Sequence, residues 1–246
     1  MNLPILLAVG FLFLKTGEKF ATQEAAGPTV AELTQQLGGD FEPRIFNDPA
    51  KAIEYVAKSK PAAGIVTPGF YITYAKALGM TPLLEVKRHK IPVERYVLVT
   101  KQATELTAIK SVATALAAEQ MYVMRVVLQN KLGEELRLQP TLDEEGAVFD
   151  LVEGGKSAAD AVLLEEAAWE VLRADPELGA QVKAAFTSAE LPGNLVVTFG
   201  GRADSAKLVE SLKTTPPAIL ESIRVEVFSD IAAERLKRAE ELFHAK

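Results

Sequence analysis

The stretch that decides the fold class is Pro61-Ala62-Ala63-Gly64-Ile65-Val66-Thr67-Pro68-Gly69-Phe70-Tyr71. Its first half is short and apolar, which predicts a buried strand over residues 62–66. The chain then turns directly into a helix, expected over residues 68–78 and ended by Gly79. A strand that runs into a helix in this way is the unit of an open α/β sheet. Ligands bind where such strands end, because unpaired backbone N–H groups and the helix dipole converge there.

The sequence on both sides of this stretch continues the alternation of strands and helices. Apolar residues at 3–9 predict the first strand, with Gly10 opening the loop after it. Pro28 is expected near the first position of a helix over 28–37, and Asp48 is expected to cap the next helix. The other strands expected in this part of the chain lie at 41–46 and 82–86.

Two long apolar strands, at 93–100 and 195–199, divide the chain into unequal blocks. The middle block holds a complete βαβαβ set, whereas the first and last blocks cannot each close a core alone. We therefore expect two α/β lobes joined by two crossing strands, with a ligand cleft between the lobes. The first lobe would comprise residues 1–98 and 195–246, mostly helical after residue 204, and the second lobe residues 99–194. Within the middle block, strands are expected at 110–115, 136–138, 159–163 and 182–186, and helices at 119–131 and 144–153.

The composition is that of a globular protein and excludes several classes of function. Hydrophobic residues make up 48% of the 246 residues and charged residues 24%, as expected for a chain with a real core. The net charge is −6 and the Lys and Arg residues are scattered, so we expect no nucleic-acid partner. The chain has no cysteine, and its two histidines, His89 and His244, lie far apart in sequence, so we expect neither thiolate chemistry nor a metal site.

The apolar N-terminal stretch at 3–14 bears on localisation. It is too short for a membrane-spanning helix, which needs about 20 apolar residues. It also lacks the basic start and the small-residue cleavage site of a leader peptide. If the protein is exported, we therefore expect its leader peptide to have been removed already; the resemblance described below implies that the location is the periplasm.

No motif of a common enzyme class is present. The sequence contains no G-x-S-x-G, H-E-x-x-H, P-loop or glycine-rich dinucleotide motif. We therefore predict a binding protein that is not an enzyme and needs no cofactor. Two alternatives stay open: an enzyme that uses a carboxylate pair such as Glu119 and Glu165, and an effector-sensing domain of a regulator.

Several segments, taken in their order along the chain, resemble a periplasmic solute-binding protein of the phosphate/phosphonate-binding type, a type II periplasmic binding protein. The resemblance covers nearly the whole chain and implies the two-lobed fold. It also implies a ligand held between lobes that close by a hinge motion, and a membrane partner that receives the ligand. The segments are NDPAKAI (47–53) with PAAGIV (61–66), residues 106–113, GGKSAADA (154–161) and AELPGNLVV (189–197).

The loop after the first strand of the second lobe departs from this resemblance. Oxyanion-binding members of the family carry a run of serines and threonines there, whose hydroxyls and nearby helix N–H groups surround the anion. In this chain the position reads Ala113-Thr114-Ala115-Leu116-Ala117-Ala118-Glu119-Gln120-Met121-Tyr122. Only Thr114 offers a hydroxyl, and Glu119 would place a carboxylate against the anion, a repulsion on the order of several kcal/mol. The departure argues against a phosphate or phosphonate ligand.

The positions that the resemblance places in the cleft are mostly apolar. This predicts a lipid or sterol-like ligand, as in a sterol-carrying offshoot of the family, because burial stabilises apolar area by about 25 cal/mol per Å². Glu119, Tyr122 and Asn194 would orient a single hydroxyl of that ligand. The expected ligand-binding residues are Thr67, Phe70, Tyr71, Thr114, Leu116, Glu119, Met121, Tyr122, Leu164, Glu165 and Asn194.

A second interpretation keeps the parent family's ligand. It predicts the binding component of an ABC importer for phosphate, phosphonate or another small polar solute. The spacing of Met121 also fits a helix core, and Glu119 also fits a first-turn acid favoured by the helix dipole. The membrane partner is accordingly predicted to be a transporter or a lipid-transfer protein.

Overall fold

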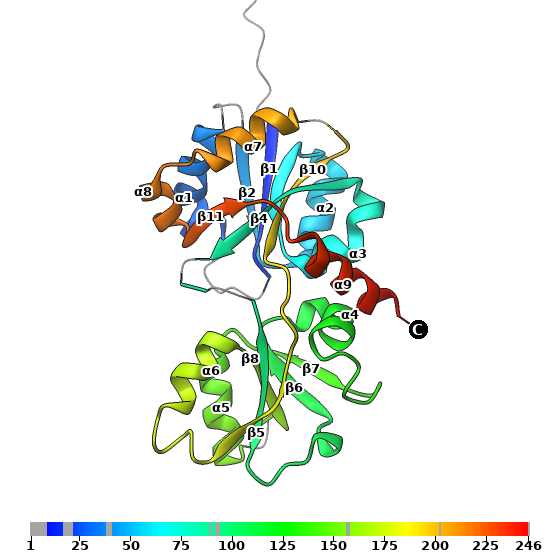
Figure 1. Cartoon of the computed structure of the whole chain (residues 1–246), viewed down its shortest axis with the longest axis vertical. Helices are drawn as coiled ribbons and strands as arrows, with labels where there is room; N and C mark the ends of the chain where they lie inside the picture. Colours follow the sequence, from blue (N-terminus) through cyan, green and yellow to red (C-terminus); the bar gives the residue numbers. More distant parts are fainter. Residues whose placement is uncertain are drawn as a thin grey trace, which may run out of the picture. The chain divides into compact units, whose positions relative to one another are not determined.

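The computed structural model describes residues 9–16, 22–37, 41–88, 90–91, 94–155, 158–201 and 203–245. The chain forms two compact α/β units, each built around a sheet of its own (Figure 1). The first unit comprises Met1–Pro92 and Gly193–Ala232, and the second comprises Val93–Pro192 and Ala233–Lys246. The chain therefore crosses between the units near residues 92, 192 and 232. The α/β class predicted from the sequence is confirmed.

The sheet of the first unit has six strands in the order β11-β4-β10-β3-β1-β2. β1 is parallel to both β2 and β3, whereas β10 runs antiparallel to β3 and β4, and β11 runs antiparallel to β4. A strand from late in the sequence thus lies in the middle of this sheet. The strands are β1 (Val9–Leu14), β2 (Phe41–Phe46), β3 (Ala63–Val66), β4 (Met80–Arg88), β10 (Asn194–Phe199) and β11 (Val225–Ser229).

Helices cover both faces of the first sheet. On one face, Leu33 of α1 and Leu208 of α7 share a hydrophobic core with Phe11 of β1, and α8 packs at its edge. The helices α2 and α3 lie on the opposite face (Figure 1). The bounds are α1 (Gln23–Gln36), α2 (Pro49–Ser59), α3 (Pro68–Leu78), α7 (Ser205–Lys213) and α8 (Pro217–Ser222).

The two helices on that opposite face begin and end where their sequence signals predict. The Asp48 side chain caps α2 by accepting a hydrogen bond from the Ala50 N–H at 2.9 Å. α3 begins at Pro68 and ends before Gly79, whose φ of +62° is a conformation that favours glycine.

The N-terminal strand and helix differ from the prediction. β1 extends to Leu14 and includes Gly10, because the core buries the apolar residues that follow it. α1 begins at Gln23, since the Thr22 hydroxyl accepts the Ala25 N–H at 3.2 Å and caps the helix earlier than expected. Pro28 therefore lies inside the helix, where it removes one backbone hydrogen bond. Residues 3–8, on which the strand prediction depended, lie outside the described residues.

The sheet of the second unit has five strands in the order β7-β6-β8-β5-β9. β6 is parallel to β7 and β8, and β5 is antiparallel to β8 and β9. The core contains Trp169 together with Val97 and Val162. The elements are β5 (Tyr96–Lys101), β6 (Ser111–Thr114), α4 (Gln120–Tyr122), β7 (Arg137–Pro140), α5 (Glu144–Glu153), β8 (Ala161–Glu165), α6 (Glu166–Arg173), β9 (Val182–Thr187) and α9 (Ala233–His244).

The helix predicted over 119–131 is shorter and irregular. A 3₁₀ turn at Ala117–Glu119 leads into α4, and a π-helical turn follows at Val123–Val127. In that turn the Leu128 N–H donates to the Val123 carbonyl at 2.8 Å. Buried β-branched valines fill the segment and weaken its preference for a regular α-helix.

The C-terminal part differs from the prediction in two ways. A strand, β11, interrupts the helices expected after residue 204, and it pairs with the edge of β4. The last helix, α9, packs in the second unit, whereas the predicted first lobe included residues 195–246. The Arg125 guanidinium donates to the Phe243 carbonyl at 2.7 Å and so ties this helix to the π-helical turn.

Candidate functional site

The strand order of the first sheet places a topological switch point between β1 and β3. The chain leaves β1 for β2 on one side, and β3 lies on the other side. In open α/β sheets, ligands bind outside the carboxyl ends of the strands at such a point. In this unit the two strand ends lead to Thr16 and to the start of α3 at Thr67.

Thr67 caps α3 and is already bonded within the unit. Its hydroxyl accepts the Phe70 N–H at 3.2 Å, and its carbonyl accepts the Tyr71 N–H at 3.0 Å. Phe70 is only 1% exposed and its ring packs against Tyr74, while Tyr71 is also buried. These three predicted ligand-binding residues are therefore brought together at the switch point, but the rings of Phe70 and Tyr71 are buried.

Thr16 is a functional candidate that the sequence prediction missed. It follows β1 directly and is only 6% exposed, yet its hydroxyl has no hydrogen-bond partner among the residues that the structure describes. The prediction ended the first strand at residue 9, so Thr16 was not considered as a strand-end residue. The signal was present in the sequence as the first uncharged polar residue after the apolar run.

The corresponding switch point of the second sheet lies between β6 and β8. Here the backbone N–H groups meet acceptors from the chain itself. The Ala115 N–H donates to Glu144 Oε1 at 3.1 Å, and the Leu116 N–H donates to the Thr114 hydroxyl at 3.2 Å. The carboxylate of Glu144, at the start of α5, thus lies where an anionic ligand would be expected. The sequence prediction missed Glu144 because it is distant from this loop in the chain.

Glu119 and Tyr122, predicted to act together, are indeed neighbours and are both buried. Burial, the carboxylate of Glu119 and that of Glu94 raise the pKa of Tyr122 above its ordinary value of 10.0. The phenol therefore stays protonated at neutral pH and can donate a hydrogen bond. This part of the second unit combines acidic oxygens with a neutral hydroxyl.

The apolar residues predicted to line the cleft are mostly core residues. Leu164 is 0% exposed and packs in the core of the second unit, and Leu116 is buried. Met121 is 45% exposed and is the one side chain of this apolar set, which also includes Phe70, that offers substantial surface. Glu165 is half-buried at the end of β8. Little of the apolar wall expected from the sequence is available to a ligand.

Within the described ranges, no group of three or more His, Asp or Glu side chains is arranged to hold a metal ion. No helix in those ranges is long and apolar enough to cross a membrane. The candidate sites of both units consist of hydroxyls, carboxylates and backbone donors.

Comparisons with known proteins give the fold its name. No family model and no curated protein matches the chain. Among solved structures, a Xanthomonas citri protein bound to ATP is 13% identical, with 96% of this chain and 97% of that chain covered, and a TM-score of 0.70. A binding protein component of an ABC phosphonate transporter from Pseudomonas aeruginosa is 14% identical over 95% of this chain and 84% of that chain, with a TM-score of 0.67. The fold is that of the periplasmic binding proteins.

A third solved structure with this fold is PhnD1 from Prochlorococcus marinus in complex with methylphosphonate. It is 12% identical, with 96% of this chain and 97% of that chain covered, and the TM-score is 0.65. At these identities the comparisons establish the fold alone.

In each unit, buried or partly buried side chains hold the segments at which the chain crosses between the two units. In the first unit, Glu85 is only 3% exposed, and its carboxylate accepts the Gly193 N–H at 2.8 Å and the Ala232 N–H at 3.0 Å. One side chain thus holds the chain at two of its three crossings. Asn194, predicted to contact the ligand, follows Gly193 at the start of β10 and is half-buried.

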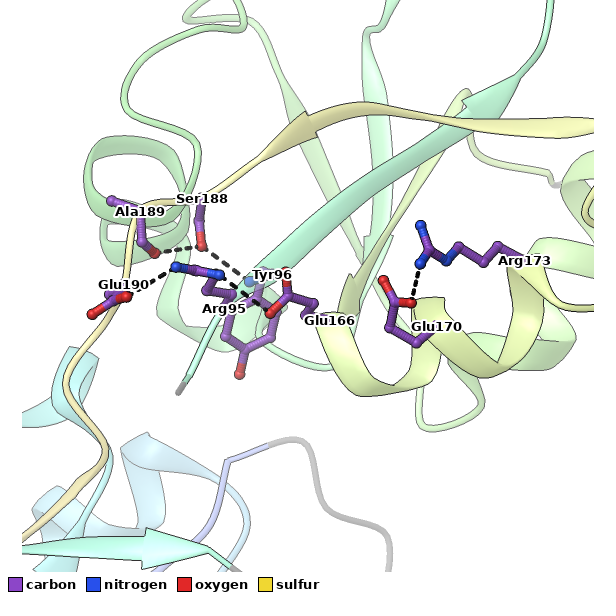
Figure 2. Close-up of polar contacts among 8 residues, drawn as sticks. All are labelled: Arg95, Tyr96, Glu166, Glu170, Arg173, Ser188, Ala189 and Glu190. Atoms are coloured by element: carbon purple, nitrogen blue, oxygen red, sulfur yellow. Dashed lines mark hydrogen bonds and ion pairs between the residues drawn. The ribbon is translucent and has the colours of Figure 1, made fainter. Parts of the chain in front are cut away.

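In the second unit, Arg95 ties the two segments nearest the crossings. Figure 2 shows its guanidinium between Glu190, at 2.9 Å, and Glu166, at 3.7 Å. Beside it, the Tyr96 N–H donates to the Ser188 hydroxyl at 3.0 Å. Hydrogen bonds and ion pairs therefore connect the start of β5 to the segment that follows β9, at Ser188 and Glu190.

Proposed function

We propose that the chain is the solute-binding component of an ABC importer, that it carries out no covalent chemistry, and that it binds a small anionic solute. The observation that carries this proposal is the fold, which is shared over 95% or more of this chain with the three solved proteins described above. One of these was solved with ATP, another with methylphosphonate, and the third belongs to a phosphonate transporter. The proposal corresponds to the second interpretation of the sequence, with its periplasmic location and membrane transporter.

The lipid interpretation receives less support. It required apolar side chains free to contact a ligand, but Phe70, Leu116 and Leu164 are buried. The solved proteins with this fold described above give a lipid or sterol ligand no support. The exposed surface of Met121 alone does not replace the area that these buried side chains would have supplied.

The experiment is a binding assay with inorganic phosphate, methylphosphonate and ATP, measured by thermal shift and by calorimetry. We expect at least one of these anions to stabilise the protein by about 2.7 kcal/mol at a concentration of one hundred times its Kd. The affinity should fall as the salt concentration rises, since salt screens charge interactions. Vesicles that contain cholesterol serve as the lipid arm. Retention of stoichiometric sterol, with no response to any anion, would contradict the proposal.

A further inference from the structure

The segment that contains α5 and α6 differs in charge from the rest of the chain. Residues 142–179 carry eleven acidic and two basic residues, which gives them a net charge of −9. Because the whole chain has a net charge of −6, all other residues together carry a net charge of +3. The negative charge of this protein is therefore concentrated in one segment of the second unit.

Both helices cover the same face of the second sheet (Figure 1). Val148 and Leu151 of α5 share one hydrophobic core with Trp169 and Leu172 of α6. The opposite side of each helix is turned away from that core. On a helix that has water as its only other neighbour, polar and charged residues are expected on this outer side.

Large apolar side chains are nevertheless exposed on the outer side. Leu142, just before α5, is 56% exposed, Phe149 of α5 is 55% exposed and Val171 of α6 is 71% exposed. Three of the six exposed large hydrophobic side chains among the described residues thus fall within this one acidic segment. Single exposed apolar residues are ordinary on a protein surface, but their concentration here indicates an interaction surface.

Phe149 lies in the middle of a stripe along α5. Glu145 precedes it by four positions and Glu153 follows it by four, so the three side chains project from the same side of the helix. Both glutamates are exposed. An aromatic ring between two carboxylates suits an arginine or lysine side chain, because the cation stacks on the ring and its N–H groups donate to the carboxylates.

The outer side of α6 has similar chemistry. Val171 follows Glu170, whose ion pair with Arg173 is exposed (Figure 2). Ala167 and Ala174 lie four positions before and three positions after Val171, and both are exposed. Their small side chains allow the backbone of a partner to approach the helix closely.

The charge of this surface decides which kind of partner fits it. A second copy of the chain that presented the same surface would be repelled, because like charges would face each other. A membrane rich in anionic lipids would repel it for the same reason. A protein segment with arginine or lysine next to apolar side chains complements both the charge and the exposed apolar side chains.

We propose that this surface docks the protein on the transmembrane subunit of the importer, through a segment of that subunit in which arginine or lysine lies beside apolar side chains. Phe149 is the central contact, and the surrounding carboxylates attract and orient the basic segment. The inference rests on the proposed function, because the partner is the transporter that this function implies. The acidic docking surface comprises Leu142, Glu145, Phe149, Glu153, Glu170 and Val171.

The test measures uptake and solute affinity separately in Phe149→Ala, Phe149→Leu and a double variant, Glu145→Lys with Glu153→Lys. Uptake of whichever radiolabelled anion binds, methylphosphonate, inorganic phosphate or ATP, is followed in cells that make each variant in place of the wild type. We expect Phe149→Ala and the double variant to lower the initial rate of uptake about tenfold. Phe149→Leu keeps an apolar side chain and should stay within about threefold of the wild type. Calorimetry should show the same Kd for the anion in all of these variants.

Glu32→Lys with Glu54→Lys is the matched control. Glu32 on α1 and Glu54 on α2 are exposed helical glutamates of the first unit, and their reversal changes the net charge by the same amount. We expect this variant to support normal uptake. The Tm of Phe149→Ala and of both double variants should stay close to that of the wild type, because the changed side chains are exposed.

A photoreactive side chain identifies the partner directly. In Phe149→p-benzoylphenylalanine we expect a crosslink to the transmembrane subunit, at a segment that contains arginine or lysine. Glu54→p-benzoylphenylalanine should give no such product. A crosslink from position 149 to a second copy of this chain or to lipid, or no crosslink at all, would overturn the docking surface.

Normal uptake in both Phe149→Ala and the Glu145→Lys, Glu153→Lys variant would also overturn the docking surface. If the wild type still binds an anion, each of these results leaves the proposed function intact. If the wild type binds none of the tested anions, the proposed function fails, and the inference that names its transporter fails with it.

Discussion

Asp160 shows how a single surface carboxylate can stabilise the second unit. Its Oδ2 accepts the N–H groups of Lys110 and Ser111 and the Ser111 hydroxyl, each at 2.9 Å. Burial alone would raise the pKa of Asp160, but these hydrogen bonds and the charge of Arg137 outweigh it, so the pKa lies below its ordinary value of 3.8. The folded state therefore favours the ionised carboxylate.

Asp160→Asn is expected to lower the free energy of unfolding of the second unit at pH 7 by about 1 kcal/mol, because the amide is a weaker acceptor for three donors. A depressed pKa stabilises the fold above the unfolded value, and this contribution is lost as the pH falls through the folded pKa. The difference in the free energy of unfolding between variant and wild type should therefore shrink below pH 3.8. Urea unfolding followed by fluorescence of Trp169, the chain's single tryptophan, reports on this unit.

Ser111→Ala removes one of the three donors and keeps the carboxylate, so it should give a smaller loss with the same pH dependence. A gap between Asp160→Asn and the wild type that is equal at pH 7 and pH 3 would contradict this account.

For single residues, the sequence predicted which neighbouring side chains lie close together better than it predicted what each side chain does. Glu119 and Tyr122 lie close in the chain and share a short helical segment, so their meeting could be inferred. The partners of Ala115 and Gly193 could not, because Glu144 and Glu85 reach them across long stretches of sequence. The sequence marks Thr16 only as the first uncharged polar residue after an apolar run; the structure adds that it is buried and that its hydroxyl has no hydrogen-bond partner among the described residues.

Among the secondary-structure elements, the close approach of β1 and β3 depends on Gly64. A Cβ at this position would lie 2.5 Å from the Leu12 carbonyl oxygen, which is backbone and cannot move aside easily. We expect Gly64→Ala to destabilise the first unit by about 1–3 kcal/mol. Amide hydrogen exchange of Ile65 should report the loss, because its strand would open more readily.

Gly133→Ala is the control for this prediction, since nothing lies within 4 Å of a Cβ there. We expect its effect on stability to stay within about 0.5 kcal/mol. If both variants lose stability equally, the cost reflects glycine itself and not the contact between the strands.

Elements with strong local signals were predicted well, and those that depend on pairing were not. Asp48 with Pro49 fixes the start of α2, and Gly79 fixes the end of α3, so the sequence carries these boundaries. β11 is a short strand among helices and exists because the edge of β4 is there to pair with it. Its sequence alone gives no indication of that edge.

For the whole molecule, the least predictable feature is where the last helix packs. The buried residues of α9, Leu236 and Ala239, show that one of its faces packs against something, but they do not specify the partner. The partner is fixed by Arg125, whose guanidinium bonds the Phe243 carbonyl and lies 6.0 Å from the centre of its ring.

Arg125→Ala should therefore destabilise the second unit by about 1–2 kcal/mol, since a charged hydrogen bond is lost, and should leave the first unit unchanged. Trp169 fluorescence in urea follows the second unit, and hydrogen exchange of β1 and β3 follows the first. Arg173→Ala, which breaks an exposed ion pair with Glu170 on α6 (Figure 2), should cost about 0.5 kcal/mol or less. A loss confined to the first unit would show that α9 supports that unit instead.

The position of β10 between β3 and β4 has a consequence for the newly made chain. All strands of the second sheet lie between Tyr96 and Thr187, so translation supplies them before β10 begins at Asn194. Until then, β3 and β4 emerge from the ribosome without the strand that joins them. Open strand edges invite pairing with other chains, so this interval is the one in which a chaperone would matter most. The sheet of the first unit is therefore begun first and completed after the sheet of the second unit.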